Sequence, residues 1–439
     1  MNNHRLLTGL LVASLWSGGV CAVAANRRVV TMEELFRIAE TNSAQLRPSF
    51  TAEEVARQEI SVARSKYLPD IEVNLSFSYI GDGFTTKRNL SDRQKAEIPH
   101  FGNNLGLSVS QPVYTGGALT AGVKLAKQKA TAANYSTEMQ RDNIRFRLAG
   151  FYLDIYKYDN LRDVVENNII QSRQVLQEMK ARYEQGMALQ NDITRYELLV
   201  SNLELQLVKI KNTLTILNRN LVVTAGLPEN TEIVPDTTIL DRALPKTDEE
   251  WWHETAKAEA PGLKLARTGV DISRTAESLV RSERLPKIGL KAAWSMEGPI
   301  LVEIPPIDRN LSYWYVGVGI SYNLSSLYKS NKSLSKSRVA TREAVERLEA
   351  ANENVDLDVR AGYVRYMEAF EELKTQRKSV ELAERNYNIV ATRYGEGMAL
   401  ITDMLDAANS KLDAEQMLVN ARINIIQNYY RLLYTSGKI

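Results

Sequence analysis

The sequence is poor in the residues from which most enzymatic sites are built. It contains one cysteine, Cys21, and three histidines, of which His100 and His253 lie far apart in the chain. No cluster of these residues has the spacing of a metal site, and no glycine-rich loop that would cradle phosphates or a dinucleotide is present. We therefore expect a protein that is not an enzyme and that holds no metal or cofactor.

The sequence also lacks a marked excess of either charge. Charged residues make up 25% of the chain, but the formal net charge is only +2, whereas a dedicated nucleic-acid-binding protein carries a concentrated basic surface. Hydrophobic residues make up 44% and recur throughout, which argues against disorder. We expect an ordered protein that does not have nucleic acid as a partner.

Long hydrophobic runs are missing beyond the N-terminus. There, a basic residue precedes the apolar stretch Leu6–Trp16, and the small residues of a cleavage site follow at Ala22–Ala25. Because Val20, and not a smaller residue, precedes Cys21, a lipoprotein signal is not expected. No later stretch reaches the roughly 18–20 apolar residues of a spanning helix. We interpret residues 1–25 as a signal peptide and expect any membrane span of the exported chain to consist of strands.

What the chain does contain is one pattern written twice. The segment Arg182–Leu189 reads RYEQGMAL, and Arg393–Leu400 reads RYGEGMAL. The same offset continues without a gap through further matches, namely Asp192/Asp403, Leu207/Leu418, Leu221/Leu432 and Gly226/Gly437. We therefore divide the mature chain into two structural repeats, residues 26–230 and residues 231–439. Each reads as a helix, a pair of strands, one long helix, a tight turn and another helix.

Each repeat also opens on a pattern that typically starts a helix. Thr31 with Glu34, and Thr247 with Glu250, have the spacing at which the two side chains cap a helix start reciprocally. We expect a helix to begin at each of these boxes.

Four short segments alternate apolar with polar residues. They are Ile71–Tyr79 and Leu105–Val113 in the first repeat, and Ile288–Trp294 and Trp314–Tyr322 in the second. Alternation over about ten residues is typical of a half-buried strand, and about 9–11 residues suffice to cross a bilayer as part of a barrel. Taken alone, the pattern favours an ordinary sheet on a soluble core, but the helices change that balance.

The helical segments are far longer than those of an ordinary globular domain. Residues 118–185 contain no proline and would form a helix about 100 Å long, and residues 327–396 match them. After the first turn, apolar residues follow the three-four spacing of a coiled-coil seam, at Ile193, Tyr196, Val200, Leu203, Leu207, Ile210, Leu214, Leu217 and Leu221. The second repeat places smaller or polar residues at several equivalent positions, among them Ala407, Lys411, Ala414, Ala421 and Asn428. The two hairpins are therefore expected to pack differently.

Four strands per chain imply self-association. The smallest membrane barrels need about eight strands, and an open edge in lipid leaves backbone groups unpaired at several kcal/mol each. Two copies would give a filled barrel, whereas three copies give twelve strands and room for a lumen. We also expect the shorter helical segments, residues 32–66 and 192–225, to stack end to end beside the long one. The predicted fold is mainly α, with a trimeric twelve-stranded outer-membrane β-barrel continuous with a long α-helical coiled-coil barrel.

The order of elements, the duplication and the Arg-Tyr-x-x-Gly…Asp motif resemble outer-membrane efflux proteins of the TolC type. The phrases Leu107–Gly117 before the long helix and Ile401–Ala407 after the second turn carry the same resemblance, which covers essentially the whole mature chain. It implies a homotrimer in outer-membrane lipid that extends into the periplasm. It also implies a passive exit duct for efflux or type I secretion, working with a periplasmic adaptor (membrane fusion) protein and an inner-membrane transporter of RND, MFS or ABC type. The alternative is a periplasmic coiled-coil adaptor or spacer, which leaves the strands unexplained.

The turns between the long helices carry the candidate site. Gly186 and Gly397 lie where each helix must reverse, and glycine permits the positive φ that ends a helix. Asp192 and Asp403 follow where an acid caps or favours a helix start. Asp403 and Asp406 project from one face of a helical turn, so three copies would set six carboxylates around one constriction, which attracts cations. The alternative for these acids is a solvated helix start.

The family resemblance implies further roles at the same turns. Asp403 and Asp406 match acids of the periplasmic entrance ring, and Tyr394 and Asp192 match residues of the links that hold the entrance shut. A basic residue of that pattern is replaced here by Ala399, so we consider Arg195 as a substitute partner. The apolar turns suggest docking with a partner hairpin, which the resemblance identifies as the adaptor. The predicted docking residues are Gly186, Met187, Ala188, Leu189, Gly397, Met398, Ala399 and Leu400.

Overall fold

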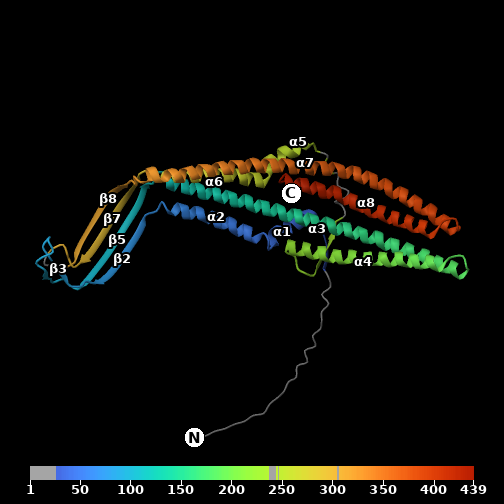
Figure 1. Ribbon diagram of the computed structural model, residues 1–439, viewed down its shortest axis with the longest axis horizontal. Helices are drawn as coiled ribbons and strands as arrows, with labels where there is room; N and C mark the ends of the chain where they lie inside the picture. The colour runs from blue at the N-terminus through green and yellow to red at the C-terminus, as the bar shows by residue number, and fades with distance from the viewer. Residues whose placement is uncertain (1–25, 237–243, 246, 304–305) are drawn as a thin grey trace, which may run out of the picture.

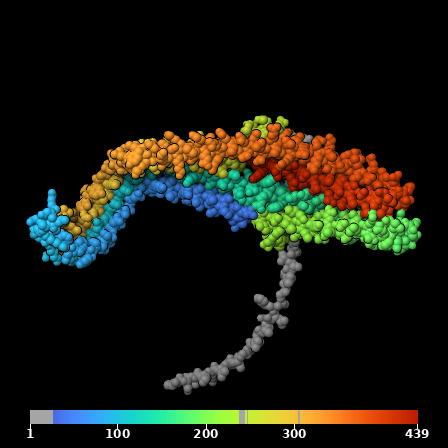
Figure 2. Space-filling model, viewed as in Figure 1, coloured from blue at the N-terminus to red at the C-terminus, as the bar shows by residue number. Residues whose placement is uncertain are grey.

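The chain forms a long, curved wall with a sheet at one end and two helical tips at the other (Figures 1 and 2). A computed structural model describes residues 26–236, 244–245, 247–303 and 306–439. The predicted signal peptide, residues 1–25, lies outside the described residues. The sheet and the tips are joined by helices that run along almost the full length of the molecule (Figure 1).

Four antiparallel strands form the sheet in the order β2-β5-β7-β8. Their bounds are Asp70–Tyr79 for β2, Phe101–Tyr114 for β5, Lys287–Gly298 for β7 and Leu311–Ser321 for β8. These strands contain the four predicted alternating segments to within one residue. Each repeat thus contributes one strand pair, and the β5–β7 contact joins the two repeats. A small hairpin of β3 (Gly83–Thr85) and β4 (Gln94–Ala96) lies in the loop between β2 and β5.

The strand register gives the sheet one apolar face and one polar face. Side chains along a strand point alternately to the two faces, so each row of paired residues shares a face. One row consists of Val73, Leu107, Trp294 and Trp314, and the next consists of Asn74, Gly106, Ser295 and Tyr313. The apolar face is not covered within the chain, since the side chain of Ile71 is 68% exposed and that of Val316 is 70% exposed.

Eight helices are found among the described residues, four in each repeat. In the first repeat they are α1 (Met32–Asn42), α2 (Arg47–Ser65), α3 (Ala118–Glu184) and α4 (Gln190–Ala225), and in the second α5 (Glu249–Glu259), α6 (Pro261–Ser282), α7 (Ser326–Gly395) and α8 (Ile401–Thr435). The two long helices, α3 and α7, therefore match the predicted segments closely. None of the described helices combines the length and the apolar content that crossing a lipid bilayer requires.

The two predicted helix-start boxes have different outcomes. The hydroxyl of Thr31 accepts a hydrogen bond from the Glu34 amide at 3.2 Å, as expected, while the Glu34 carboxylate pairs with Arg28 at 2.7 Å. In the second repeat the N-cap is Asp248, and it makes no side-chain capping bond. The predicted box of Thr247 with Glu250 is wrong, because the helix begins one residue too late for Thr247 to reach its first turn.

The end of α4 meets the end of α1 beside the long helix, as the predicted end-to-end stacking requires, but the single segment expected over residues 32–66 is divided into α1 and α2. α4 ends at Gly226, whose φ is 74° and whose Cα faces the carbonyl group of Asn42 at the end of α1. At the equivalent junction Gly437 has a φ of 70°, and an added methyl group there would lie 2.8 Å from the carbonyl oxygen of Glu259 at the end of α5. Only glycine combines this backbone conformation with such a close approach.

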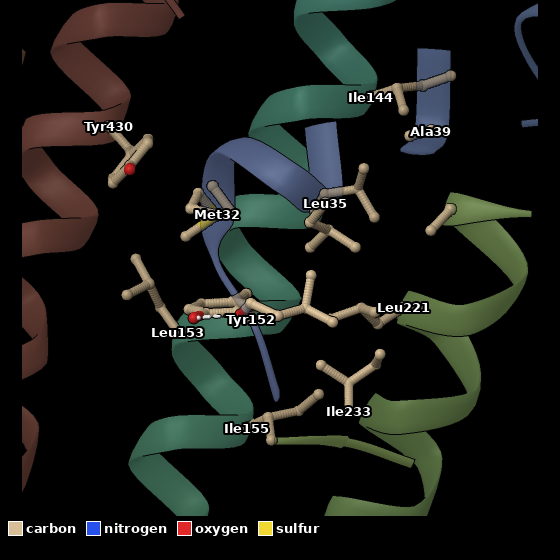
Figure 3. Close-up of a cluster of buried hydrophobic side chains, with 14 of the residues drawn as sticks. Met32, Leu35, Ala39, Ile144, Tyr152, Leu153, Ile155, Leu221, Ile233 and Tyr430 are labelled. Carbon is tan, nitrogen blue, oxygen red and sulfur yellow. Dashed lines mark hydrogen bonds between the residues drawn. The ribbon is translucent and has the colours of Figure 1, made fainter. Parts of the chain in front are cut away.

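The largest buried cluster lies at the junction of α1 and α4 on α3 (Figure 3). There, two short parallel strands, β1 (Asn26–Val30) and β6 (Thr231–Pro235), join the beginning of the first repeat to the chain that follows it. The hydroxyl of Tyr152 donates to the carbonyl of Val30 at 2.9 Å and accepts from the amide of Asp236 at 2.6 Å. Burial raises the pKa of Tyr152 to about 12, so this link stays protonated at neutral pH.

Replacing Gly226 with alanine should lower the thermal unfolding midpoint, followed by far-ultraviolet circular dichroism. The new methyl group would collide with the Asn42 carbonyl, in addition to a cost of roughly 1–2 kcal/mol for a left-handed L-residue. Gly186→Ala is the matched control, because Gly186 has a φ of 75° and an added methyl group there meets nothing within 4 Å. An equal loss of stability in both variants would contradict the close-approach explanation.

Candidate functional site at the helical tips

Both long helices end in the same backbone motif. Gly186 and Gly397 have φ values of 75° and 73°. Just beyond them, the amide of Met187 donates to the carbonyl of Arg182, and the amide of Met398 to that of Arg393, each at 2.8 Å. This bond pattern satisfies the last carbonyls of a helix that ends in a left-handed glycine. The repeated RYxxGM sequence therefore builds two closely similar tips.

The predicted docking residues lie at the extreme end of the molecule. The large apolar side chains are exposed at both tips, with fractions of 66% for Met187, 69% for Leu189, 65% for Met398 and 69% for Leu400. Ala188 and Ala399, which separate them, are half-buried. Within one chain, the two tips thus present four uncovered apolar side chains to the same region of solvent.

The acids lie at the beginnings of the two returning helices. The carboxylate of Asp403 accepts a hydrogen bond from the amide of Leu400 at 3.1 Å, so Asp403 caps α8. Asp406 is exposed one turn further along, and Asp192 is half-buried in the first turn of α4. The capping expected of Asp403 is therefore observed, while the role of the acids in a constriction stays a prediction.

Tyr394 belongs to a buried cluster that joins the two hairpins near their tips. It packs against side chains from α3, α4 and α8, including Met179, Tyr196 and Met404. Its pKa is raised above the ordinary tyrosine value, first by burial and then by the negative charge of Asp192, while Arg182 acts in the opposite direction. The structure thus brings the predicted residues Tyr394 and Asp192 into one neighbourhood.

Arg182 is a tip residue that sequence reasoning missed. Its guanidinium donates from Nη1 to the carbonyl oxygen of Gly395 at 2.7 Å, which ties the end of α3 to the end of α7. The available signal was the recurrence of arginine at the start of both turn motifs. The predicted partner Arg195 is exposed, and within the part of the chain that the structure describes it forms no ion pair.

Across the described residues, no group of three or more histidine, cysteine, aspartate or glutamate side chains is placed to hold a metal ion. The two tips present exposed apolar side chains and acids near the helix starts, and they are joined by contacts between the two helical hairpins. These features suit a gate and a docking point.

The sequence comparisons agree with this geometry. The family model described as outer membrane efflux protein matches residues 35–227 and 252–438. The outer membrane protein TolC of Vibrio cholerae serotype O1 is 23% identical over 93% of this chain and 91% of its own length. The alkaline protease secretion protein AprF of Pseudomonas aeruginosa is 20% identical over 92% of this chain and 83% of its own length.

Two solved structures show the same fold. The outer-membrane channel OprN superimposes with a TM-score of 0.78 at 15% identity, covering 93% of this chain and 90% of OprN. The outer membrane protein VceC of Vibrio cholerae superimposes with a TM-score of 0.76 at 15% identity, covering 92% of this chain and 96% of VceC. Because the family model matches most of the chain, this protein is a member of the outer membrane efflux protein family.

Proposed function

We propose that three copies of this chain close into one passive duct, and that a periplasmic adaptor and an inner-membrane transporter of RND, MFS or ABC type deliver its substrates. As an outer membrane efflux protein, the chain is an outer-membrane exit duct for efflux or type I secretion. The observation that carries the trimer is that the wall formed by one chain is unfinished at both edges.

The edges of the sheet are the first unfinished part. β2 and β8 are the outer strands, and each has one neighbour among the described strands. Backbone groups left unpaired in lipid cost several kcal/mol each. Pairing of β2 with β8 of the next copy would satisfy them, and three copies would close a twelve-stranded barrel with the apolar face towards lipid. A periplasmic spacer would have no use for such a sheet.

The edges of the helical wall are unfinished as well. In the tip-proximal half the helices lie side by side in the order α4, α3, α8, α7. The two outer helices each carry an exposed apolar stripe on the face opposite their buried seam. On α4 this stripe consists of Leu198, Leu205, Val208, Ile216 and Val223, and on α7 it consists of Leu357, Val364, Leu382 and Ile389, all at least 50% exposed.

The two stripes match in level along the molecule. Gln206 of α4 donates to Gln416 of α8 at 3.1 Å. Helices α8 and α7 run in opposite directions, and Lys411 contacts Tyr387 while Asn424 contacts Glu372. Gln416 lies between these two contacts on α8. The α7 residue at its level is therefore Leu382, to within about one turn. Leu205 and Leu382 thus stand at about the same height. Because rotation about a symmetry axis preserves height, Leu205 of one copy would meet Leu382 of the next.

A cysteine pair tests this assembly. The only natural cysteine lies in the predicted signal peptide, so oxidation of the Leu205→Cys, Leu382→Cys double variant should link neighbouring chains into a covalent trimer on a non-reducing gel. The Leu205→Cys, Leu357→Cys pair is the control, because those positions are several turns apart in level. A detergent-solubilised monomer by light scattering would overturn the proposed function. The Leu205→Cys, Ile389→Cys pair tests a shift of about two turns along α7. If the protein is a trimer but neither pair forms a link, only the proposed contact between the α4 and α7 stripes is overturned.

We further propose that the tips gate this duct. Support comes from Asp403 and Asp406 in the first turns of α8, with Asp192 and Tyr394 beside the contact between the hairpins. Threefold symmetry would place six carboxylates around one entrance, where they attract cations. In this arrangement Arg195, which is exposed on α4, is available to an acid of a neighbouring copy.

Neutralising this ring should change ion selectivity. In planar bilayers, Asp403→Asn with Asp406→Asn should reduce the preference for cations and weaken block by divalent cations, because six negative charges are removed from the narrowest point. Glu381→Gln is the control, since that carboxylate lies on α7 and pairs with Lys378. Parent-like selectivity and block in the double asparagine variant would remove the acids from the gate.

The exposed tip side chains are proposed to dock the adaptor's hairpin. Met398→Asp should abolish transport, measured as drug accumulation or secretion in cells, because it buries a charge in an apolar contact. Folding and trimer formation should persist, since Met398 is 65% exposed and packs against nothing in the core. Met417→Asp, at an exposed methionine of α8 far from the tip, is the control. Normal transport with Met398→Asp would exclude this docking point.

A further inference from the structure

A lysine occupies a buried seam position of α8. Lys411 is 8% exposed, although it stands where the first repeat has Val200, which is 7% exposed. An ammonium group in a coiled-coil seam is unfavourable unless it is paired. Val200 therefore shows that an apolar side chain suits this seam position. Lys411, in contrast, requires polar partners that Val200 does not need.

Those partners come from three helices. The Lys411 ammonium donates to the Gln171 side-chain oxygen of α3 at 2.9 Å and lies 5.0 Å from the ring centre of Tyr387 on α7. It is also 3.7 Å from the Glu415 carboxylate, whose other oxygen accepts from Asn168 of α3 at 2.8 Å. The first repeat has no such layer, because Val200 lies in an apolar cluster.

Along α8, this polar layer lies between two apolar clusters. On the sheet side, Leu412 packs with side chains such as Val165 and Leu203. On the tip side, Met404 packs with side chains such as Met179 and Tyr196. A slide of α8 along α3 by one turn would take the ammonium from Gln171 and move it among apolar side chains. A buried polar residue of this kind is known to fix the register of coiled coils.

We infer that Lys411 is a positioning residue for the tip gate: by fixing α8 against α3, it fixes the height of Asp403 and Asp406 relative to the first hairpin. The two acids lie on the same helix, about 12 Å and about 8 Å nearer the tip. A cationic side chain, an amide and an aromatic ring thus set the geometry of a carboxylate ring that they do not touch. The inference rests on the proposed gate and adds the residue that sets its register.

Single-channel recording in planar bilayers tests the inference. Lys411→Met keeps the volume and makes the seam apolar, as in the first repeat, so the protein should fold without loss of thermal stability. Its conductance should spread over several levels, and its mean should rise several-fold, because α8 is free to shift. Val200→Met is the matched control at the equivalent site, and it should behave like the parent.

A second variant tests the same contact without removing the charge. Gln171→Leu should give the same spread of conductance, and adding it to Lys411→Met should give no further change, because both break one contact. Parent-like conductance in Lys411→Met and in Gln171→Leu would overturn the inference and leave Lys411 a packing residue. Absence of conductance in the parent protein would instead overturn the proposed duct.

Discussion

The whole structure depends on one constraint: each backbone N–H and C=O group that lies in lipid must find a hydrogen-bond partner within protein. The four-stranded sheet cannot meet it alone, because its outer strands, β2 and β8, have unpaired edges. In the proposed assembly, a second copy on each side would pair both edges at once, and a closed ring would pair them for all copies. The same holds for the helices. Each of the four strands is joined directly to a helix, so the edges of the sheet continue as the edges of the helical wall. The apolar stripes of α4 and α7 stand at those edges.

The duplication explains how one chain builds so long a wall with few buried residues. Each repeat lays three shorter helices against one long helix, and the joint between two of them needs a glycine that tolerates both a left-handed backbone and a close carbonyl group. Gly226 and Gly437 meet this need at equivalent places. The repeats differ in the seams of their two hairpins. Val200 leaves the first hairpin with a wholly apolar seam, whereas Lys411 introduces a polar layer into the second.

Much of this fold could be predicted from the sequence because its elements are long and strongly periodic. Alternation located all four strands, and the three-four spacing located the α4 seam. The Thr247 box failed because capping depends on the residue at which a helix begins, and a neighbouring acid, Asp248, took that position. The recurrence of arginine in both turn motifs marked the position of Arg182, but its contact with a carbonyl of α7 could not be predicted. It joins residues that are distant in sequence, and a backbone acceptor leaves no mark in the amino-acid pattern.

The chemistry of the sheet's polar face fits a duct whose selectivity lies elsewhere. Most of its side chains are neutral, as in the row of Asn74, Gly106, Ser295 and Tyr313. Charges of both signs occur on this face. Asp70 and Lys291 share one row through Ser110, whereas Glu72 and Glu297 have no basic residue in their rows. The tips are more acidic, because Asp192 and Asp403 stand in the first turns of α4 and α8 and Asp406 follows one turn after Asp403. Under the proposed function, control of passage would therefore lie at the periplasmic tips.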